Sequence, residues 1–143
     1  MNKINTLWVV DDDEIYRFAI KIIINRAAIA ENTFYYNNGQ VAIDAFSENL
    51  ASPDQLPDLI LLDLNMPVLD GWQFLDALCK ILPTLNKKVH IFLVSSSNDE
   101  EDFERAKTWK EVADFIVKPL TTQALHAILA RLHPDALQPQ QLL

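Results

Sequence analysis

Residues 59–71 read LILLDLNMPVLDG, and this segment decides the fold. It opens with a short apolar run, which is typical of a strand that is buried on both faces of a parallel sheet. Asp63 follows the run directly, and Pro67 and the Asp70-Gly71 pair then turn the chain. We therefore expect Asp63 at the carboxyl end of a buried strand, which is where open α/β sheets bind ligands. Taken alone, Asp63 would fit an ordinary turn or capping residue better.

Strand-like and helix-like segments alternate on both sides of this stretch. Apolar, β-prone runs predict strands at residues 7–10, 33–36, 59–62, 90–94 and 113–117. Helical spacing of apolar residues predicts helices at residues 14–28, around 41–46, and at 70–82, 99–109 and 121–132. This alternation predicts an α/β fold, a doubly wound parallel sheet with right-handed crossovers and helices on both faces.

The first predicted helix carries a clear apolar stripe. Its members follow i, i+3, i+4, i+7, i+8 spacing and are Ile15, Phe18, Ala19, Ile22 and Ile23. Such a stripe is typical of the core-facing side of an amphipathic helix. We expect Asp13 to cap this helix, Asp70 to cap the third, and Thr121 or Thr122 to cap the last.

The composition indicates one acidic domain. The chain has 143 residues, of which 50% are hydrophobic, and its net charge of -8 argues against general binding to nucleic acid or anionic membrane. Its single cysteine, Cys79, rules out an internal disulfide framework and a cysteine-based zinc site. No signal peptide or bilayer-spanning run is evident, so we expect a cytoplasmic protein. We place the domain at residues 1–133 and a short flexible tail at residues 134–143.

Polar side chains follow four of the predicted strands. Asp11 and Asp12 follow the first strand, Asp63 the third, Ser95 the fourth and Lys118 the fifth. In a parallel sheet these strand ends share one edge, so the side chains can converge there. Three carboxylates without His or Cys favour a hard cation such as Mg²⁺. Such a cluster suits phosphoryl transfer, in which a carboxylate can act as the nucleophile.

These residues resemble the signature of response-regulator receiver domains of two-component signalling. The matching fragments are VVDD at residues 9–12, LDLNMPVLDG at 62–71, VS at 94–95 and VKP at 117–119. The resemblance covers about residues 6–132 and is to the single-domain, chemotaxis-regulator-like type. It implies a flavodoxin-like (βα)5 fold with strand order 2-1-3-4-5. Many receivers carry Gly-Ala before the last strand, whereas this chain has Val112-Ala113.

The resemblance assigns an acceptor and a metal site. Asp63 would accept a phosphoryl group from the phosphohistidine of a sensor histidine kinase. Mg²⁺ would be held by Asp11, Asp12, Asp63 and the backbone carbonyl of Asn65, with Asp12 binding directly and Asp11 mainly through water. The chain would be a phosphoacceptor signalling domain that promotes its own phosphotransfer and autodephosphorylation, and not an enzyme acting on other substrates.

The resemblance also assigns a switch. Lys118 would pair with the phosphoryl group, the Lys118–Pro119 peptide bond would be cis, and Ser95 would hydrogen-bond a phosphoryl oxygen after transfer. Phe115 would then swing inward and change a face formed by the fourth helix, fifth strand and fifth helix. Without the resemblance, Lys118 fits a surface lysine, Ser95 a loop serine and Phe115 an ordinary core aromatic.

The function that follows is a response-regulator receiver in a two-component system or phosphorelay. Its expected partners are a sensor histidine kinase and a downstream partner protein or phosphotransfer protein, with no direct contact to nucleic acid or membrane; a phosphorylation-dependent homodimer is left open. One alternative is an interaction module of the same fold that works without phosphorylation. Another is an aspartyl-phosphate hydrolase, although such enzymes usually carry a second Asp where this chain has Asn65.

Overall fold

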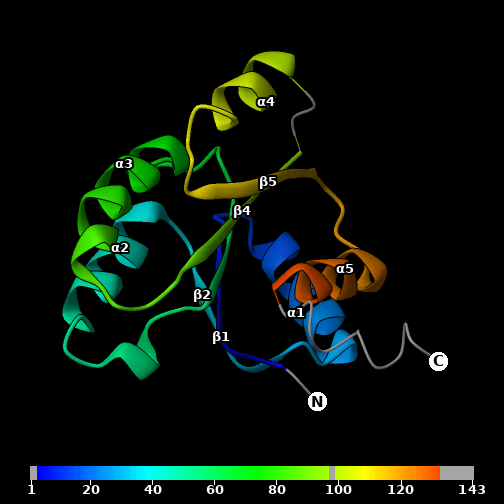
Figure 1. The fold of residues 1–143 in the computed structure, drawn as a ribbon. Helices are drawn as coiled ribbons and strands as arrows, with labels where there is room; N and C mark the ends of the chain where they lie inside the picture. Colours follow the sequence, from blue (N-terminus) through cyan, green and yellow to red (C-terminus); the bar gives the residue numbers. More distant parts are fainter. Residues whose placement is uncertain (1–2, 97–98, 133–143) are drawn as a thin grey trace.

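A five-stranded parallel sheet forms the centre of the computed structural model, which describes residues 3–96 and 99–132 (Figure 1). The strand order is β2-β1-β3-β4-β5, which confirms the predicted doubly wound fold. The strands are β1 (Ile4–Val10), β2 (Ala30–Tyr36), β3 (Leu59–Leu62), β4 (His90–Ser95) and β5 (Val112–Val117). The helices are α1 (Glu14–Ala27), α2 (Gly39–Glu48), α3 (Gly71–Ile81), α4 (Glu100–Ala106) and α5 (Thr122–Leu132), with short 3₁₀ turns η1 (Pro53–Gln55) and η2 (Leu82–Thr84).

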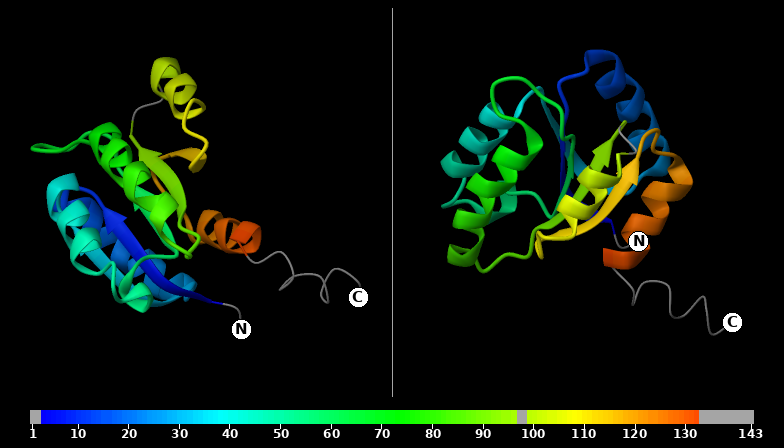
Figure 2. Two further views of the ribbon diagram at one scale, coloured as in Figure 1. Left: turned by 60° about the vertical axis from the view of Figure 1, so that its left-hand side comes forward. Right: turned by 90° about the horizontal axis from the view of Figure 1, so that it is seen from above.

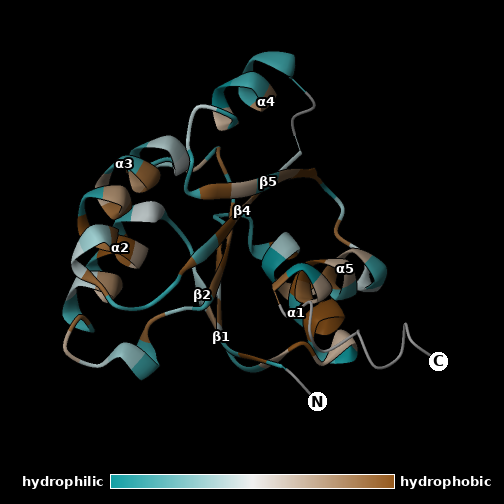
Figure 3. Cartoon of the chain, in the orientation of Figure 1, coloured by the Kyte–Doolittle hydropathy of each residue, from teal (hydrophilic) through white to brown (hydrophobic). Residues whose placement is uncertain are grey.

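The helices form two layers around the sheet. Helices α1 and α5 cover one face, α2 and α3 cover the other, and α4 lies at the β5 end (Figures 1 and 2). Strand β3 is buried on both faces: Leu59 and Leu61 join the core under α1 and α5, while Ile60 and Leu62 join the core under α2 and α3. The apolar centre of the sheet is visible in the hydropathy colouring (Figure 3). The prediction of a fully buried central strand is therefore confirmed.

The prediction that this apolar stripe of α1 faces the core was wrong. Ala19 is exposed, and the exposed fractions of the large members of the stripe are 81% for Ile15, 70% for Phe18 and 45% for Ile22. The buried side of α1 consists instead of Ile20, Ile24 and Ala27, and only Ile23 of the predicted stripe packs against the core. The Asp13 N–H donates to Oδ1 of Asp11 at 2.9 Å, and this turn leads directly from β1 into the Asp13 cap, so it constrains how the helix leaves the strand. This helix has two apolar sides, so periodicity alone did not identify the inner one.

Side-chain caps begin the helices as predicted. Asp13 accepts hydrogen bonds from the backbone N–H groups of Ile15 and Tyr16, at 3.0 and 3.1 Å. Asp70 forms a capping box with Gln73 at the start of α3. At the start of α5, the Thr121 hydroxyl oxygen accepts a hydrogen bond from the Ala124 N–H, at 3.0 Å. These caps fix where the loops at the carboxyl edge of the sheet end.

Helix α4 is shorter than the predicted span of 99–109. Beyond Ala106 the backbone switches to i→i−3 hydrogen bonds, among them Thr108 N–H to Arg105 O at 3.0 Å and Trp109 N–H to Ala106 O at 3.1 Å. Val112, which stands where many receivers have glycine, begins β5 without a left-handed backbone. No helix within residues 3–96 and 99–132 combines the length and apolar character needed to cross a membrane. The tail predicted at residues 134–143 lies outside the described residues.

Candidate phosphoacceptor and metal site

Three carboxylates meet at the carboxyl edge of the sheet. Asp11 follows β1 and Asp63 follows β3, and these strands are neighbours in the sheet. One carboxylate oxygen each from Asp11, Asp12 and Asp63 lies within 4.8 Å of the others. Asp11 and Asp63 are buried, with exposed fractions of 2% and 6%, whereas Asp12 is exposed. The structure thus brings together the three carboxylates that the sequence places at strand ends.

Lys118 supplies positive charge to this cluster. Its Nζ lies 2.7 Å from Oδ2 of Asp11 and 3.7 Å from Oδ1 of Asp63. The backbone N–H of Lys118 donates to the carbonyl of Ser95 at 2.8 Å, and the Lys118–Pro119 peptide bond is cis. Among the described residues, no other cation forms an ion pair with these carboxylates. Three carboxylates therefore share one cation, and the cluster carries a surplus of negative charge.

Burial and the surplus charge both act on the pKa of Asp63. Burial, then the neighbouring carboxylate of Asp11 and, to a smaller extent, that of Asp12 raise this pKa from 3.8 to about 6. The ammonium of Lys118 and a hydrogen bond from the backbone of Leu64 act in the opposite direction without cancelling the rise. In the protein without bound metal, the ionised form of Asp63 is thus disfavoured, and a bound cation would favour it.

Tyr16 is a member of the site that the sequence analysis missed. The Nζ of Lys118 lies 3.9 Å from the centroid of its ring, so the ring covers the ammonium and helps to place it. Burial, and then the charges of Asp11 and Asp63, raise the pKa of Tyr16 and keep its hydroxyl protonated. A signal was present in the sequence, because Tyr16 lies at i−4 from Ile20 and therefore on the true inner side of α1.

The loop that follows Asp63 is held by the only two glycines of the chain. A Cβ on Gly71 would lie 2.5 Å from the carbonyl oxygen of Asp63, and a Cβ on Gly39 would lie 2.5 Å from the carbonyl oxygen of Leu69. Gly71 N–H also donates to the carbonyl of Leu64 at 2.9 Å. The starts of α2 and α3 therefore approach this loop so closely that no larger residue fits. Asn65, the predicted carbonyl ligand, is exposed within it.

The predicted switch residues lie on the neighbouring strands. Ser95 is fully buried at the end of β4, where it pairs with Val117 of β5. Phe115 of β5 is half-buried, and its ring centroid lies 5.9 Å from that of Phe103 on α4 in an edge-to-face arrangement. Ser95 thus lies at the same edge as the carboxylates. Phe115 lies on β5, the strand that pairs with β4, and it packs β5 against α4.

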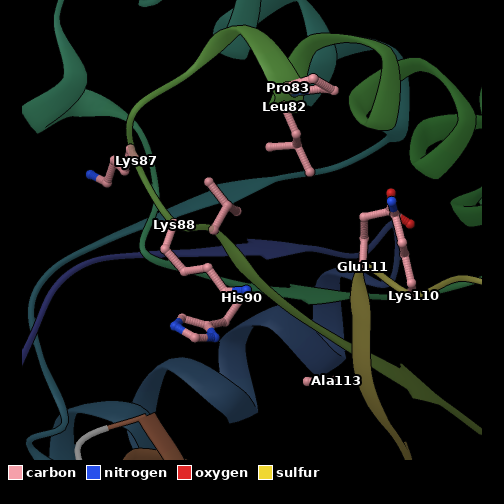
Figure 4. A pocket seen from close by; sticks show the side chains of 9 residues that line it. Leu82, Pro83, Lys87, Lys88, His90, Lys110, Glu111 and Ala113 are labelled. Atoms are coloured by element: carbon pink, nitrogen blue, oxygen red, sulfur yellow. The ribbon is translucent and has the colours of Figure 1, made fainter.

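The donor set fits magnesium. All three converging ligands are carboxylates, which are hard oxygen donors, and Mg²⁺ is commonly bound through carboxylates with water and phosphate completing its octahedron. Asp11, Asp12 and Asp63 are the residues that would hold the ion. A separate pocket of about 520 Å³ lies at the opposite edge of the sheet, near Lys88, His90 and Lys110 (Figure 4). The charged cluster is distinct from that pocket.

Comparison with known proteins identifies the family. Residues 7–130 match the family model described as the response regulator receiver domain. The sensor kinase/phosphatase LuxN of Vibrio campbellii is 30% identical over 128 residues, which cover 90% of this chain but 13% of that protein. A two-component response regulator of Cytophaga hutchinsonii superposes with a TM-score of 0.83 at 30% identity, covering 91% of this chain and 97% of that one.

The phosphorylated cyanobacterial phytochrome response regulator RcpA is a further structural relative. It has a TM-score of 0.69 at 25% identity and covers 90% of this chain and 91% of its own. The family match spans nearly all of the described residues, and it includes every strand end that contributes to the carboxylate cluster. The chain belongs to the response regulator receiver domain family of two-component signalling.

Proposed function

We propose that this receiver domain accepts a phosphoryl group on Asp63 from the phosphohistidine of a histidine kinase, with Mg²⁺ as cofactor. The observation that carries the proposal is the meeting of Asp63 with Asp11, Asp12 and Lys118 at one edge of the sheet. Asp63 is the only one of the three carboxylates that follows β3, at the centre of the sheet order. The kinship to a sensor kinase/phosphatase and to a phosphorylated response regulator supports this chemistry.

The transfer would form one bond and break another. A carboxylate oxygen of Asp63 bonds to phosphorus, while the phosphorus–nitrogen bond of the donor breaks and the imidazole leaves with the electron pair. When bound, Mg²⁺ neutralises charge on the phosphoryl oxygens. Asp11 and Asp12 hold the ion, and Lys118, already 3.7 Å from Asp63, provides a fixed positive charge beside the acceptor.

The consequence of transfer would be a change of the face near β5. Ser95 would donate a hydrogen bond to a phosphoryl oxygen, and Phe115 would respond because its strand pairs with the end of β4. Phe115 packs on Phe103, so its movement would alter the contact between β5 and α4. A downstream partner protein, or a phosphotransfer protein that takes the phosphoryl group onward, would read this change.

The test is the intact mass after incubation with acetyl phosphate, with Mg²⁺ or with a chelator. We expect wild type to gain one phosphoryl group only with Mg²⁺, and Asp63→Asn to gain none. Asp58→Asn is the matched control, because Asp58 also contacts a lysine but lies at the opposite edge of the sheet. A mass gain in Asp63→Asn, or none in folded wild type with several small phosphodonors, would overturn the proposal and favour an interaction module that works without phosphorylation.

A further inference from the structure

A groove of about 330 Å³ lies between α4 and β5, and its lining residue Val117 directly precedes Lys118 of the carboxylate cluster. Its apolar lining consists of Phe103 from α4 and Phe115 and Val117 from β5, and Asp99 and Glu100 complete the lining. Phe103 and Val117 have exposed fractions of 42% and 46%, which is high for large apolar residues beside a core. The groove therefore offers an apolar and aromatic floor next to carboxylates.

The segment that contributes these two carboxylates is strongly acidic. Residues 99–107 read DEEDFERAK, with five carboxylates and two bases. Both bases are already engaged within the chain: Arg105 lies 4.4 Å from the ring centroid of Trp72, and Lys107 pairs with Glu104 at 3.3 Å. By contrast, Glu100, Glu101 and Asp102 form no ion pair with any residue in the described part of the chain. The hydrophilic colour of α4 in Figure 3 reflects this composition.

The floor of the groove includes a ring that already attracts a cation. The Nζ of Lys107 lies 4.7 Å from the ring centroid of Phe103, so this aromatic residue already accommodates a cation beside it. An aromatic floor and the carboxylates beside it together suit a side chain that has an apolar stem and a cationic head. Arginine fits better than lysine, because its planar guanidinium can both stack on an aromatic ring and form bidentate hydrogen bonds with a carboxylate.

We infer that this groove receives an arginine side chain from a basic segment of a partner protein. The stem would pack on Phe103, Phe115 and Val117, and the guanidinium would face Glu100. The excess negative charge of α4 would draw basic segments and repel acidic ones, which gives specificity as well as a faster encounter. The inference rests on the proposed function only for its link to phosphorylation, because Phe115 is both the proposed switch residue and part of the groove.

The experiment is an NMR titration of the ¹⁵N-labelled full chain with two short acetylated peptides. One peptide carries two arginines between leucines, and the other carries citrulline at both positions, which keeps the shape and removes the charge. We expect saturable shifts centred on residues 99–117 with the arginine peptide, at least fivefold weaker binding of the citrulline peptide, and further weakening at high salt. Equal binding of both peptides, shifts centred on another face, or no shifts at millimolar peptide would overturn the inference.

Three variants distinguish binding in the groove from non-specific electrostatic attraction. Phe103→Ser and Glu100→Gln should each weaken the arginine peptide several-fold, whereas Glu48→Gln, an exposed carboxylate at the end of α2, should leave binding unchanged. Equal losses in all three variants would show non-specific attraction and overturn the inference. Acetyl phosphate labelling of the same samples keeps the two proposals apart: a mass gain without peptide binding overturns only the groove, and peptide binding without a mass gain overturns only the phosphoacceptor.

Discussion

Each edge of the sheet holds a lysine beside an aspartate, yet the two pairs differ in charge balance. At the amino edge, Lys87 Nζ donates to the carbonyls of Pro53 and Leu56 at 2.8 and 2.6 Å and lies 3.3 Å from Asp58 (Figure 4 shows Lys87). The other carboxylate oxygen of Asp58 accepts a hydrogen bond from the Thr6 N–H at 2.9 Å. Each charge in this pair has an opposite charge or a hydrogen-bond partner, and the pair joins η1, β1 and the start of β3.

At the carboxyl edge the same residue types are out of balance. Lys118 is shared between Asp11 and Asp63, and Asp12 adds a third carboxylate. Burial first, and then the neighbouring carboxylates, raise the pKa of Asp63 to about 6. The comparison shows that a lysine–aspartate contact by itself does not mark a functional site. The carboxyl edge differs by an unmatched surplus of negative charge, which a bound cation could offset.

The largest expected effect comes from removing each lysine. Lys118→Ala leaves the buried Asp11 without its cation, which should lower the free energy of unfolding by about 3 kcal/mol near neutral pH. Lys87→Ala should cost only about 1 kcal/mol, because the carboxylate of Asp58 keeps an exposed fraction of 32% and a hydrogen bond from the Thr6 N–H. Urea unfolding of both variants measures the difference. Equal losses of unfolding free energy would show that the two lysines contribute equally to stability, and would contradict the proposed difference between the two edges.

Magnesium should act on one edge only. At about one hundred times its dissociation constant, Mg²⁺ should raise the free energy of unfolding of wild type by about 2.7 kcal/mol. Lys87→Ala should show the same gain, since the amino edge takes no part in binding. Asp12→Asn, which removes an exposed ligand at little cost to the fold, should gain much less. An undiminished gain in Asp12→Asn would place the ion elsewhere in the molecule.

Replacing aspartate by asparagine should change the free energy of unfolding in opposite directions at the two edges. Asp63→Asn removes the disfavoured charge and should stabilise the metal-free protein by about 2 kcal/mol at about pH 8. Asp58→Asn weakens the contact with Lys87 and should destabilise by about 1 kcal/mol. Thermal or urea unfolding in chelator checks both values.

The pH dependence gives an independent control on Asp63. Its pKa is about 6 in the folded protein against 3.8 for the ordinary group, so the folded state binds the proton more tightly. The destabilisation by its charge is therefore fully present above about pH 6 and disappears as the pH falls towards 4. The difference between Asp63→Asn and wild type should shrink over that range. A difference that stays constant with pH would show that the stabilisation does not come from the charge.

The sequence predicted the site better than it predicted the helix beside it. Asp11, Asp63 and Lys118 could be placed together because parallel strands align their carboxyl ends, a constraint that needs no side-chain detail. The rotation of α1 could not be predicted, since both Ile15 and Ile20 belong to helical apolar patterns and only the turn at Asp13 selects between them. For the same reason Tyr16 was missed. Lys118 lies closer to Asp11 than to Asp63, and this depends on packing that no motif encodes.

The smallest expected effect concerns backbone strain, which also has one instance at each edge. Ala28 at the end of α1 has φ of 54°, and Val68 in the loop after Asp63 has φ of 69°. A β-branched residue is costly in this left-handed region, so Val68→Gly should stabilise by about 1 kcal/mol, with a smaller gain for Ala28→Gly. Val68 is exposed, and its removal opens no cavity. Urea unfolding measures both gains.

The pair also shows whether the strain at Val68 serves the site. Strain kept at a functional loop can hold that loop in a binding geometry, whereas strain at a helix end has only a structural effect. If the loop containing Asn65 is held mainly by Gly39 and Gly71, Val68→Gly should leave Mg²⁺ affinity and acetyl phosphate labelling within about twofold of wild type, as should Ala28→Gly. A loss of Mg²⁺ affinity in Val68→Gly alone would show that the strained backbone at Val68 supports metal binding. The two edges would then differ in the role of backbone strain as well as in charge balance.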